Sequence, residues 1–150
     1  RSNIVVSTLD RLTNKLGMVL PRMEKALSDR FIARMRIRTT SDLKTVSELS
    51  GGNQQKVIIA RWLASNCKLL IFDEPTRGID VGAKAEIYVM LQELSAQGLG
   101  VVVISSDLPE VIGICDRVLV MRYGSIRATL TGDDINSEKI MLYASGGENG

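Results

Sequence analysis

The stretch KLLIFDEPTRGIDVGAKAEIYVMLQELSAQGLGVVVISSD, residues 68–107, decides the fold. Its first part, 68–75, is a continuous apolar run that ends in two acids and a proline, as a buried strand does at its carboxyl end. Residues 81–97 have a helical pattern with Asp80 as the expected cap, and residues 101–105 are a second apolar run. Strands that alternate with a helix predict an α/β fold with parallel strands.

The flanking segments add helices before this unit and a hairpin after it. Only two strands are clear candidates for parallel pairing, whereas such sheets normally have more strands and are covered on both faces. The sheet therefore looks incomplete, and we expect the chain to be a piece of a longer protein. The other predicted elements are a helical region at 1–46, a helix at 50–65, a short helix at 108–115, a hairpin at 116–130 that turns at Tyr123-Gly124, and a last helix at 137–145.

The composition is that of an ordinary soluble globular protein, with 45% hydrophobic and 24% charged residues. The net charge of +2 is too small to argue for a nucleic-acid partner. Cys67 and Cys115 are too few for a disulfide framework, so we expect reduced thiols and a cytosolic location. No apolar run approaches the roughly 20 residues needed to span a bilayer, and no signal peptide is recognisable.

Two acids, Asp73 and Glu74, follow the first strand, at the edge where ligands bind in open α/β sheets. An acid at this place can hold Mg²⁺ through water, because Mg²⁺ loses its water reluctantly. The second acid can orient or deprotonate an attacking water. Taken alone, two acids at a strand end are more often an exposed turn, and that interpretation stays open.

The segment LSGGNQQK, residues 49–56, begins the helix that precedes this strand. Ser50 can cap the helix and offer a hydroxyl, and Gly51 and Gly52 let the backbone approach a ligand closely. Free amides and the helix dipole then favour an anion. An ordinary helix cap with flexible glycines explains the same residues equally well. Trp62, on the same helix, is expected to pack in the core.

The order of these motifs resembles that of ATP-binding cassette (ABC) ATPases along nearly the whole chain. LSGGNQQK is similar to the signature motif of that family, and LLIFDE is similar to its Walker B strand. RGID resembles the D-loop, and SSDLPEV occupies the switch region. The closer resemblance is to the second, C-terminal cassette of bacterial simple-sugar importers, which carry two cassettes in one polypeptide.

The resemblance implies a partial P-loop NTPase core with parallel strands, an α-helical subdomain and a C-terminal β-hairpin. No G-x-x-x-x-G-K-[ST] motif occurs in the sequence, so the loop that cradles nucleotide phosphates is absent from it. We therefore expect a truncated product that lacks the Walker A half. Its expected parts are the helical subdomain at 1–48, the signature helix at 49–66, the back half of the ATPase core at 67–130, and a C-terminal helix and tail at 131–150.

In this family two cassettes sandwich two ATP molecules head to tail, and the resemblance divides the motifs between the two sites. Ser50, Gly51 and Gly52 are expected to contact the γ-phosphate of the ATP held by the partner cassette. Asn53 and Gln54 follow where the common pattern has a single glutamine, and they are expected to have a supporting role.

The resemblance assigns the other motifs to the chain's own ATP site. Asp73 would assist Mg²⁺ through water, Glu74 would polarise the attacking water, and Asp80 would bridge the two sites across the dimer. Ser106 stands at the switch position, where most cassettes have a histidine that contacts the γ-phosphate and the catalytic water. Serine donates a hydrogen bond but cannot carry the charge of His⁺, so we expect slow or asymmetric hydrolysis.

The resemblance implies that the intact protein binds and hydrolyses Mg-ATP and so drives import of a monosaccharide, whereas the chain alone is expected to be inactive. The implied partners are a second cassette, permease subunits that dock on the basic helical subdomain, and indirectly a periplasmic or extracellular sugar-binding protein. The implied place is the cytoplasmic face of the inner membrane. Two alternatives stay open: a regulatory cassette that binds ATP without efficient hydrolysis, and a chromosome-maintenance ATPase of the SMC type, whose long heptad coiled coils are not visible in this sequence.

Overall fold

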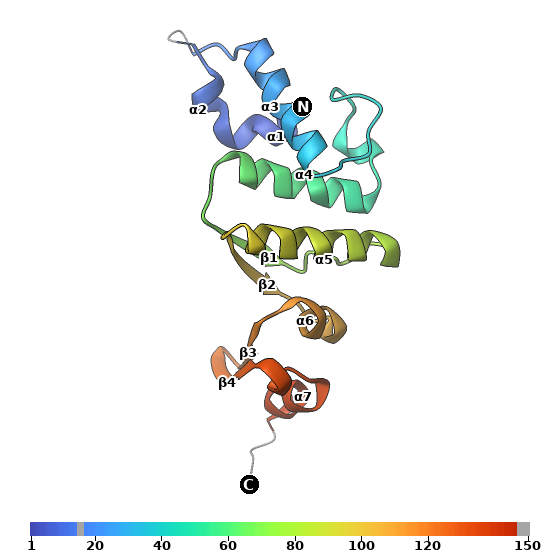
Figure 1. The fold of residues 1–150 in the computed structure, drawn as a ribbon, viewed down its shortest axis with the longest axis vertical. Helices are drawn as coiled ribbons and strands as arrows, with labels where there is room; N and C mark the ends of the chain where they lie inside the picture. Colours follow the sequence, from blue (N-terminus) through green and yellow to red (C-terminus); the bar gives the residue numbers. More distant parts are fainter. Residues whose placement is uncertain (15–16, 147–150) are drawn as a thin grey trace. The chain divides into compact units, whose positions relative to one another are not determined.

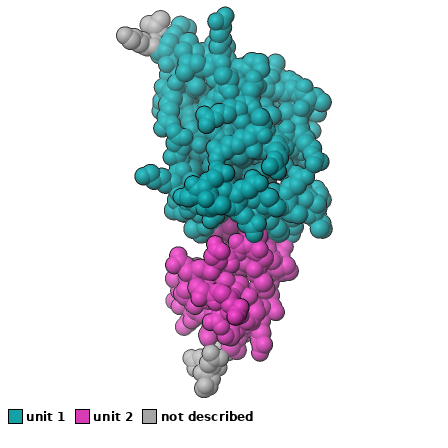
Figure 2. All heavy atoms as spheres, in the orientation of Figure 1, with its two compact units in different colours: residues 1–102 teal, residues 103–150 magenta. Residues whose placement is uncertain are grey.

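The computed structural model describes residues 1–14 and 17–146, and the chain divides into two compact units. The first unit holds residues 1–102 and the second residues 103–150 (Figure 2). The four parts implied by the family resemblance have other boundaries, and that division stays a prediction. The last residues of the expected tail, 147–150, lie outside the described residues.

Before its first strand, the described part of the first unit has short helices followed by two longer ones (Figure 1). Pro21 opens the first of the longer helices, where its fixed φ suits the first helical position and its missing amide is not needed. The helix expected at 50–65 is also present. The helical elements before the first strand are α1 (Ser2–Val5), η1 (Val6–Thr8), α2 (Leu9–Leu12), α3 (Pro21–Arg34), η2 (Val46–Glu48) and α4 (Gly51–Ala64).

Residues 68–107 contain the expected strand, helix and second strand. β1 (Leu69–Asp73) and β2 (Gly100–Ile104) are hydrogen-bonded neighbours, and α5 (Val81–Ala96) connects them as the crossover of a parallel pair. The Asp80 side chain caps α5 as expected, because its Oδ1 accepts a hydrogen bond from the Ala83 amide at 2.9 Å.

β1 is covered on one face only, whereas its apolar run predicts a buried strand. Leu70 and Phe72 are 6% and 5% exposed, whereas Leu69 and Ile71 are 53% and 63% exposed. Successive side chains of a strand point to opposite faces, and the described residues cover only the face of Leu70 and Phe72.

The core of the first unit lies around α4, which packs against α1, α3 and α5. Ile59, Ala60 and Ile87 have no exposed surface in this core. Trp62, which the sequence predicts to be part of it, is half exposed instead. The reason is its position: it lies one turn after Ile58, and these two residues share a side of α4 that the described residues leave open.

The second unit is an antiparallel hairpin with helices beside it. Tyr123 (φ 48°) and Gly124 (φ 75°) form the expected turn, and left-handed backbone at both positions is typical of a type I′ turn. Its elements are α6 (Leu108–Ile114), β3 (Arg117–Arg122), β4 (Ser125–Thr131), η3 (Gly132–Asp134) and α7 (Ser137–Ser145), with a core of Val118, Val120, Leu130 and Ile140. Neither unit has, within its described residues, a helix with the length and apolarity that a bilayer requires.

Candidate functional site

The start of α4 exposes Ser50 and Gly51 to solvent. Ser50 keeps an extended backbone (φ −62°, ψ 154°), and the helix begins at Gly51. Among the described residues the Ser50 hydroxyl makes no capping hydrogen bond, so the expectation that this side chain caps the helix is wrong. The first amides of a helix have no acceptor within the helix, which makes this end suited to an anion.

Asn53 and Gln54 hold the segment before α4 in place. The Nδ2 group of Asn53 donates to Ser50 Oγ at 2.9 Å, and its Oδ1 accepts from the backbone N–H of Arg38 at 2.8 Å. The Nε2 group of Gln54 donates to the Leu49 carbonyl at 2.9 Å. Both side chains therefore brace the backbone around Ser50, which is compatible with the supporting role expected of them.

Gly52 marks a close approach of α4 to α5. A Cβ atom at Gly52 would lie 2.6 Å from the Ala83 Cβ, closer than real Cβ contacts come, whereas a Cβ at Gly51 would meet nothing nearer than 3.9 Å. The nearest atoms to Gly51 belong to Gly78 and Ile79, so the start of α4 lies beside the segment that leads to the Asp80 cap. The packing of α4 against α5 therefore requires a glycine at position 52, whether or not a ligand also requires one there.

The two acids after β1 have different surroundings. Asp73 is the last residue of the strand and is exposed, whereas Glu74 is half-buried. Glu74 has a left-handed backbone with φ 47°, which is uncommon for residues other than glycine. The turn that follows is closed by a hydrogen bond from the Arg77 N–H to the Glu74 carbonyl at 3.2 Å. Backbone strain of this kind is common at functional sites, so it supports a functional role for Glu74.

Ser106 belongs to the second unit, whereas the other candidate residues belong to the first. It is exposed, and it directly precedes Asp107, which caps α6 by accepting a hydrogen bond from the Glu110 amide at 3.4 Å. The role expected for Ser106 at the switch position stays a prediction.

Asp73 and Glu74 at the end of β1 are the side chains that could hold Mg²⁺ at this site. In the part of the chain that the structure describes, no group of three or more His, Cys, Asp or Glu side chains could hold a metal ion. Mg²⁺ in nucleotide sites is commonly held by one or two carboxylates, by substrate phosphates and by water. The exposed carboxylate of Asp73 fits that pattern, with the nucleotide supplying the other ligands.

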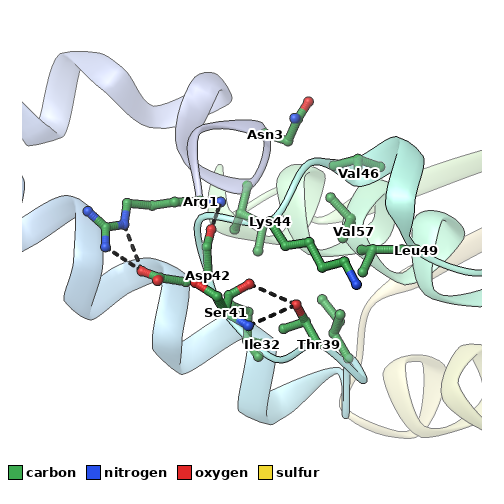
Figure 3. Close-up of a pocket in the computed structure, with 12 residues that line it drawn as sticks. Arg1, Asn3, Ile32, Thr39, Ser41, Asp42, Lys44, Val46, Leu49 and Val57 are labelled. Carbon is green, nitrogen blue, oxygen red and sulfur yellow. Dashed lines mark hydrogen bonds and ion pairs between the residues drawn. The ribbon is translucent and has the colours of Figure 1, made fainter.

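Two hollows in the first unit are not lined by the candidate residues. The first, beside the ion pair of Arg1 and Asp42 (Figure 3), has a volume of about 20 Å³, which is the space of a single water. The second, lined by Arg34, Cys67 and Gln97 among others, has a volume of about 430 Å³. Neither is lined by the start of α4 or the end of β1, so neither is the expected nucleotide site.

Comparison with known proteins identifies the family. Residues 5–77 match the family model described as ABC transporter. A ribose import ATP-binding protein from Hahella chejuensis is 50% identical over 147 residues, which are 98% of this chain and 29% of that protein. The resemblance to ABC transporter ATPases is confirmed. An arabinose import ATP-binding protein from Rhizobium johnstonii is 52% identical over 143 residues, 95% of this chain and 28% of that protein, so the chain spans less than a third of both relatives.

Solved ABC cassettes share the fold. A nucleotide-free ATP-binding cassette from an ABC transporter matches with a TM-score of 0.77 at 23% identity, over 95% of this chain and 61% of that chain. A dimeric bacterial ABC transporter cassette matches with a TM-score of 0.65 at 23% identity, over 76% of this chain and 49% of that chain. These matches confirm the fold class, which is that of the ABC ATPase core of P-loop NTPases.

This ABC chain also contains a buried cation that the sequence pattern does not reveal. Lys56 is 4% exposed, and its Nζ donates to Glu86 Oε2 at 2.6 Å and to the Arg36 carbonyl at 3.5 Å. The guanidinium of Arg38 pairs with the other Glu86 oxygen at 2.8 Å. The hydrogen bond from Lys56, together with the charges of Lys56 and Arg38, lowers the pKa of Glu86. Lysine is usually a surface residue of a helix, so only the fold shows its burial.

Replacing Glu86 by Gln is expected to lower the melting temperature of the chain at neutral pH by a few degrees, because buried Lys56 loses its anionic partner. The folded chain holds the pKa of Glu86 below its ordinary value of 4.5, so this carboxylate stabilises the fold above that pH. The stabilisation is lost as the pH falls through the lowered pKa. The difference between wild type and variant should therefore shrink in acid, and thermal unfolding from neutral pH to about pH 3 measures it.

Glu93→Gln is the matched control for this variant. Glu93 lies on the same helix, and its carboxylate is 3.8 Å from the Arg36 guanidinium. Both side chains of that pair are more than half exposed, so we expect a smaller loss of stability. Equal losses in the two variants would contradict a special contribution from the Lys56–Glu86 pair.

Proposed function

We propose that this chain is the signature and Walker B part of an ABC ATPase that energises import of a monosaccharide, and that its motifs serve two different ATP sites. The main support for the proposal lies at the start of α4. Ser50 and Gly51 are exposed there, and the first backbone amides of the helix are suited to bind a phosphate. The similarity to ribose and arabinose import proteins along nearly the whole chain supports the substrate class.

The start of α4 would complete the ATP site of a partner cassette. The amides of Gly51 and Gly52 would donate to the γ-phosphate, and the positive end of the helix dipole would stabilise its charge. The Ser50 hydroxyl would add a side-chain donor, with Asn53 and Gln54 holding it in place. The dimeric cassette among the solved structures supports a partner of this kind.

The end of β1 would act in the chain's own site. Asp73 would hold a water of the Mg²⁺ shell, and the bound ion supplies positive charge to the phosphates. Glu74 would orient the water that attacks in line and accept its proton. Asp80 would bridge the two sites through Oδ2, since its Oδ1 already accepts from the Ala83 amide.

Ser106 limits the chemistry of that site, because serine cannot provide the positive charge of a histidine. We infer slow or asymmetric hydrolysis with Glu74 as the base. A regulatory cassette that binds ATP without hydrolysing it is the second candidate, and the same serine favours it. The strained backbone of Glu74 favours catalysis. An SMC-type ATPase has less support, since the relatives named above are import proteins.

The partners follow from the same proposal. A second cassette would pair with this one head to tail. The helical region 1–48 would dock on membrane permease subunits through the basic side chains of 22–38, which are Arg22, Lys25, Arg30, Arg34, Arg36 and Arg38. A periplasmic or extracellular sugar-binding protein would act indirectly through the permease. Such an assembly would hold the chain peripherally at the cytoplasmic face of the inner membrane.

The test compares a full-length protein that contains this chain with the 150-residue chain itself. The full-length protein, reconstituted with its permease, is expected to take up a monosaccharide such as ribose or arabinose only when Mg-ATP is present. The chain alone is expected to bind Mg-ATP with a Kd above about 1 mM and not to hydrolyse it, because it has no Walker A loop. Uptake without ATP, or micromolar binding of Mg-ATP to the chain in calorimetry, would contradict the proposal.

A further inference from the structure

We propose that Asn53 is a positioning residue that turns the hydroxyl proton of Ser50 toward the nucleotide phosphate. The inference rests on the proposed function, in which Ser50 meets a γ-phosphate. It replaces the general supporting role expected of Asn53 with a defined task, and it does not require Asn53 to touch the nucleotide.

The orientation of the Asn53 amide follows from its two partners. The backbone N–H of Arg38 can only donate, so the atom that faces it at 2.8 Å is the carbonyl oxygen Oδ1. The NH₂ group then faces Ser50 Oγ at 2.9 Å and donates to it. A hydroxyl that accepts this hydrogen bond keeps its own proton for another partner, and the oxygens of an ionised phosphate are acceptors.

The surroundings of Ser50 complete a set of donors. Ser50 is exposed, so its proton can meet a ligand from solvent or from a second chain. The amides of Gly51 and Gly52 are donors at the same end of α4. The exposed hydroxyl of Ser50 and the amide of exposed Gly51 then present donors to that ligand, which is what an ionised phosphate requires.

Arg38 links Asn53 to α5. The guanidinium of Arg38 pairs with Glu86 at 2.8 Å, and Glu86 also holds buried Lys56 at 2.6 Å. Lys56 in turn donates to the Arg36 carbonyl at 3.5 Å, so α4 holds the segment of Arg36 and Arg38 at two points. Contacts among α4, α5 and the segment of Arg36 and Arg38 therefore fix the backbone N–H to which the Asn53 carbonyl oxygen is bound. A positioning role requires this fixed orientation.

A double-mutant cycle in the full-length protein, reconstituted with its permease, tests this inference with ATP as the probe. Ser50→Ala is expected to lower kcat/KM for ATP about tenfold, the effect of one lost hydrogen bond to a charged group. Asn53→Ala is expected to lower it about fivefold, mainly by raising KM, because the hydroxyl loses its orientation. Adding Asn53→Ala to Ser50→Ala is expected to change kcat/KM by less than about twofold.

The control and the contrary outcomes separate positioning from folding. Gln92→Ala, an amide truncation at an exposed position of α5 outside every motif, should leave kcat/KM unchanged. A similar loss from Asn53→Ala in both backgrounds, or a loss in kcat at unchanged KM, would mean that Asn53 only supports the fold and would overturn the inference. Wild-type kinetics in Ser50→Ala would overturn it as well. A wild-type assembly without ATP-driven uptake would instead overturn the proposed function, and with it this inference.

Discussion

Replacement of Glu74 by Gln should lower hydrolysis at this cassette's own site about 100-fold, the usual contribution of a general base, and so measurably lower ATP turnover of the full-length protein. Gln has nearly the size and shape of Glu but cannot accept a proton from the attacking water. The backbone also favours Glu74 over Asp73 as the base. Of these two residues only Glu74 has a left-handed backbone, with φ 47°, and proteins keep this energetically costly conformation often at functional sites. Steady-state phosphate release by the reconstituted assembly measures the effect.

Nucleotide binding should persist in this variant, because Glu74 is proposed to act on water and not to hold the phosphates. Glu138→Gln is the matched control, since Glu138 is exposed in the first turn of α7, and it should keep wild-type turnover. Unchanged turnover in Glu74→Gln would mean that this cassette's own site does not hydrolyse ATP. That outcome would favour the regulatory cassette over the catalytic one.

The elements of this chain were predictable because each is signalled within a few residues. The strand, helix and strand of 68–107 lie where apolar runs and helical spacing predict them. Asp80 caps α5, and Tyr123-Gly124 form the hairpin turn, because a capping carboxylate and a left-handed turn act on their own local backbone.

Burial was less predictable, because it depends on what lies next to each element. An apolar run predicts a buried strand, yet Leu69 and Ile71 of β1 are exposed. An aromatic residue on an apolar helix predicts a core position, yet Trp62 is half exposed. Which faces are covered is a property of tertiary packing, and local patterns contain only the tendency of a residue to be buried.

The candidate site shows the same limit. Motif spacing selects Ser50, but the partner of its hydroxyl is the Asn53 amide and not a helix amide, because Asn53 is itself oriented by the distant Arg38 backbone. Lys56 was missed because its burial depends on Glu86, which lies thirty residues later in the sequence. No periodicity within one helix could have paired them.

Gly52→Ala is expected to lower the free energy of unfolding of the chain by about 1–3 kcal/mol. The new Cβ would lie 2.6 Å from the Ala83 Cβ, and neither atom is the end of a flexible side chain, so α4 and α5 would have to move apart. In Gly51→Ala the nearest atoms are 3.9 Å away, so stability should be unchanged or rise by up to about 1 kcal/mol. Urea unfolding of the 150-residue chain measures both without any nucleotide.

The double variant Gly52→Ala with Ala83→Gly distinguishes a packing requirement from a need for glycine backbone freedom. Once the Ala83 Cβ is removed, the atoms nearest to the new Cβ are the Cα of residue 83 at 3.8 Å and Ile79 Cγ2 at 3.9 Å, which are ordinary contacts. Ala83→Gly alone should cost about 1 kcal/mol as a glycine within a helix. If the α4–α5 contact explains Gly52, the double variant should be more stable than Gly52→Ala. If the two losses simply add, the contact with Ala83 does not explain the loss, and the backbone freedom of glycine at position 52 does.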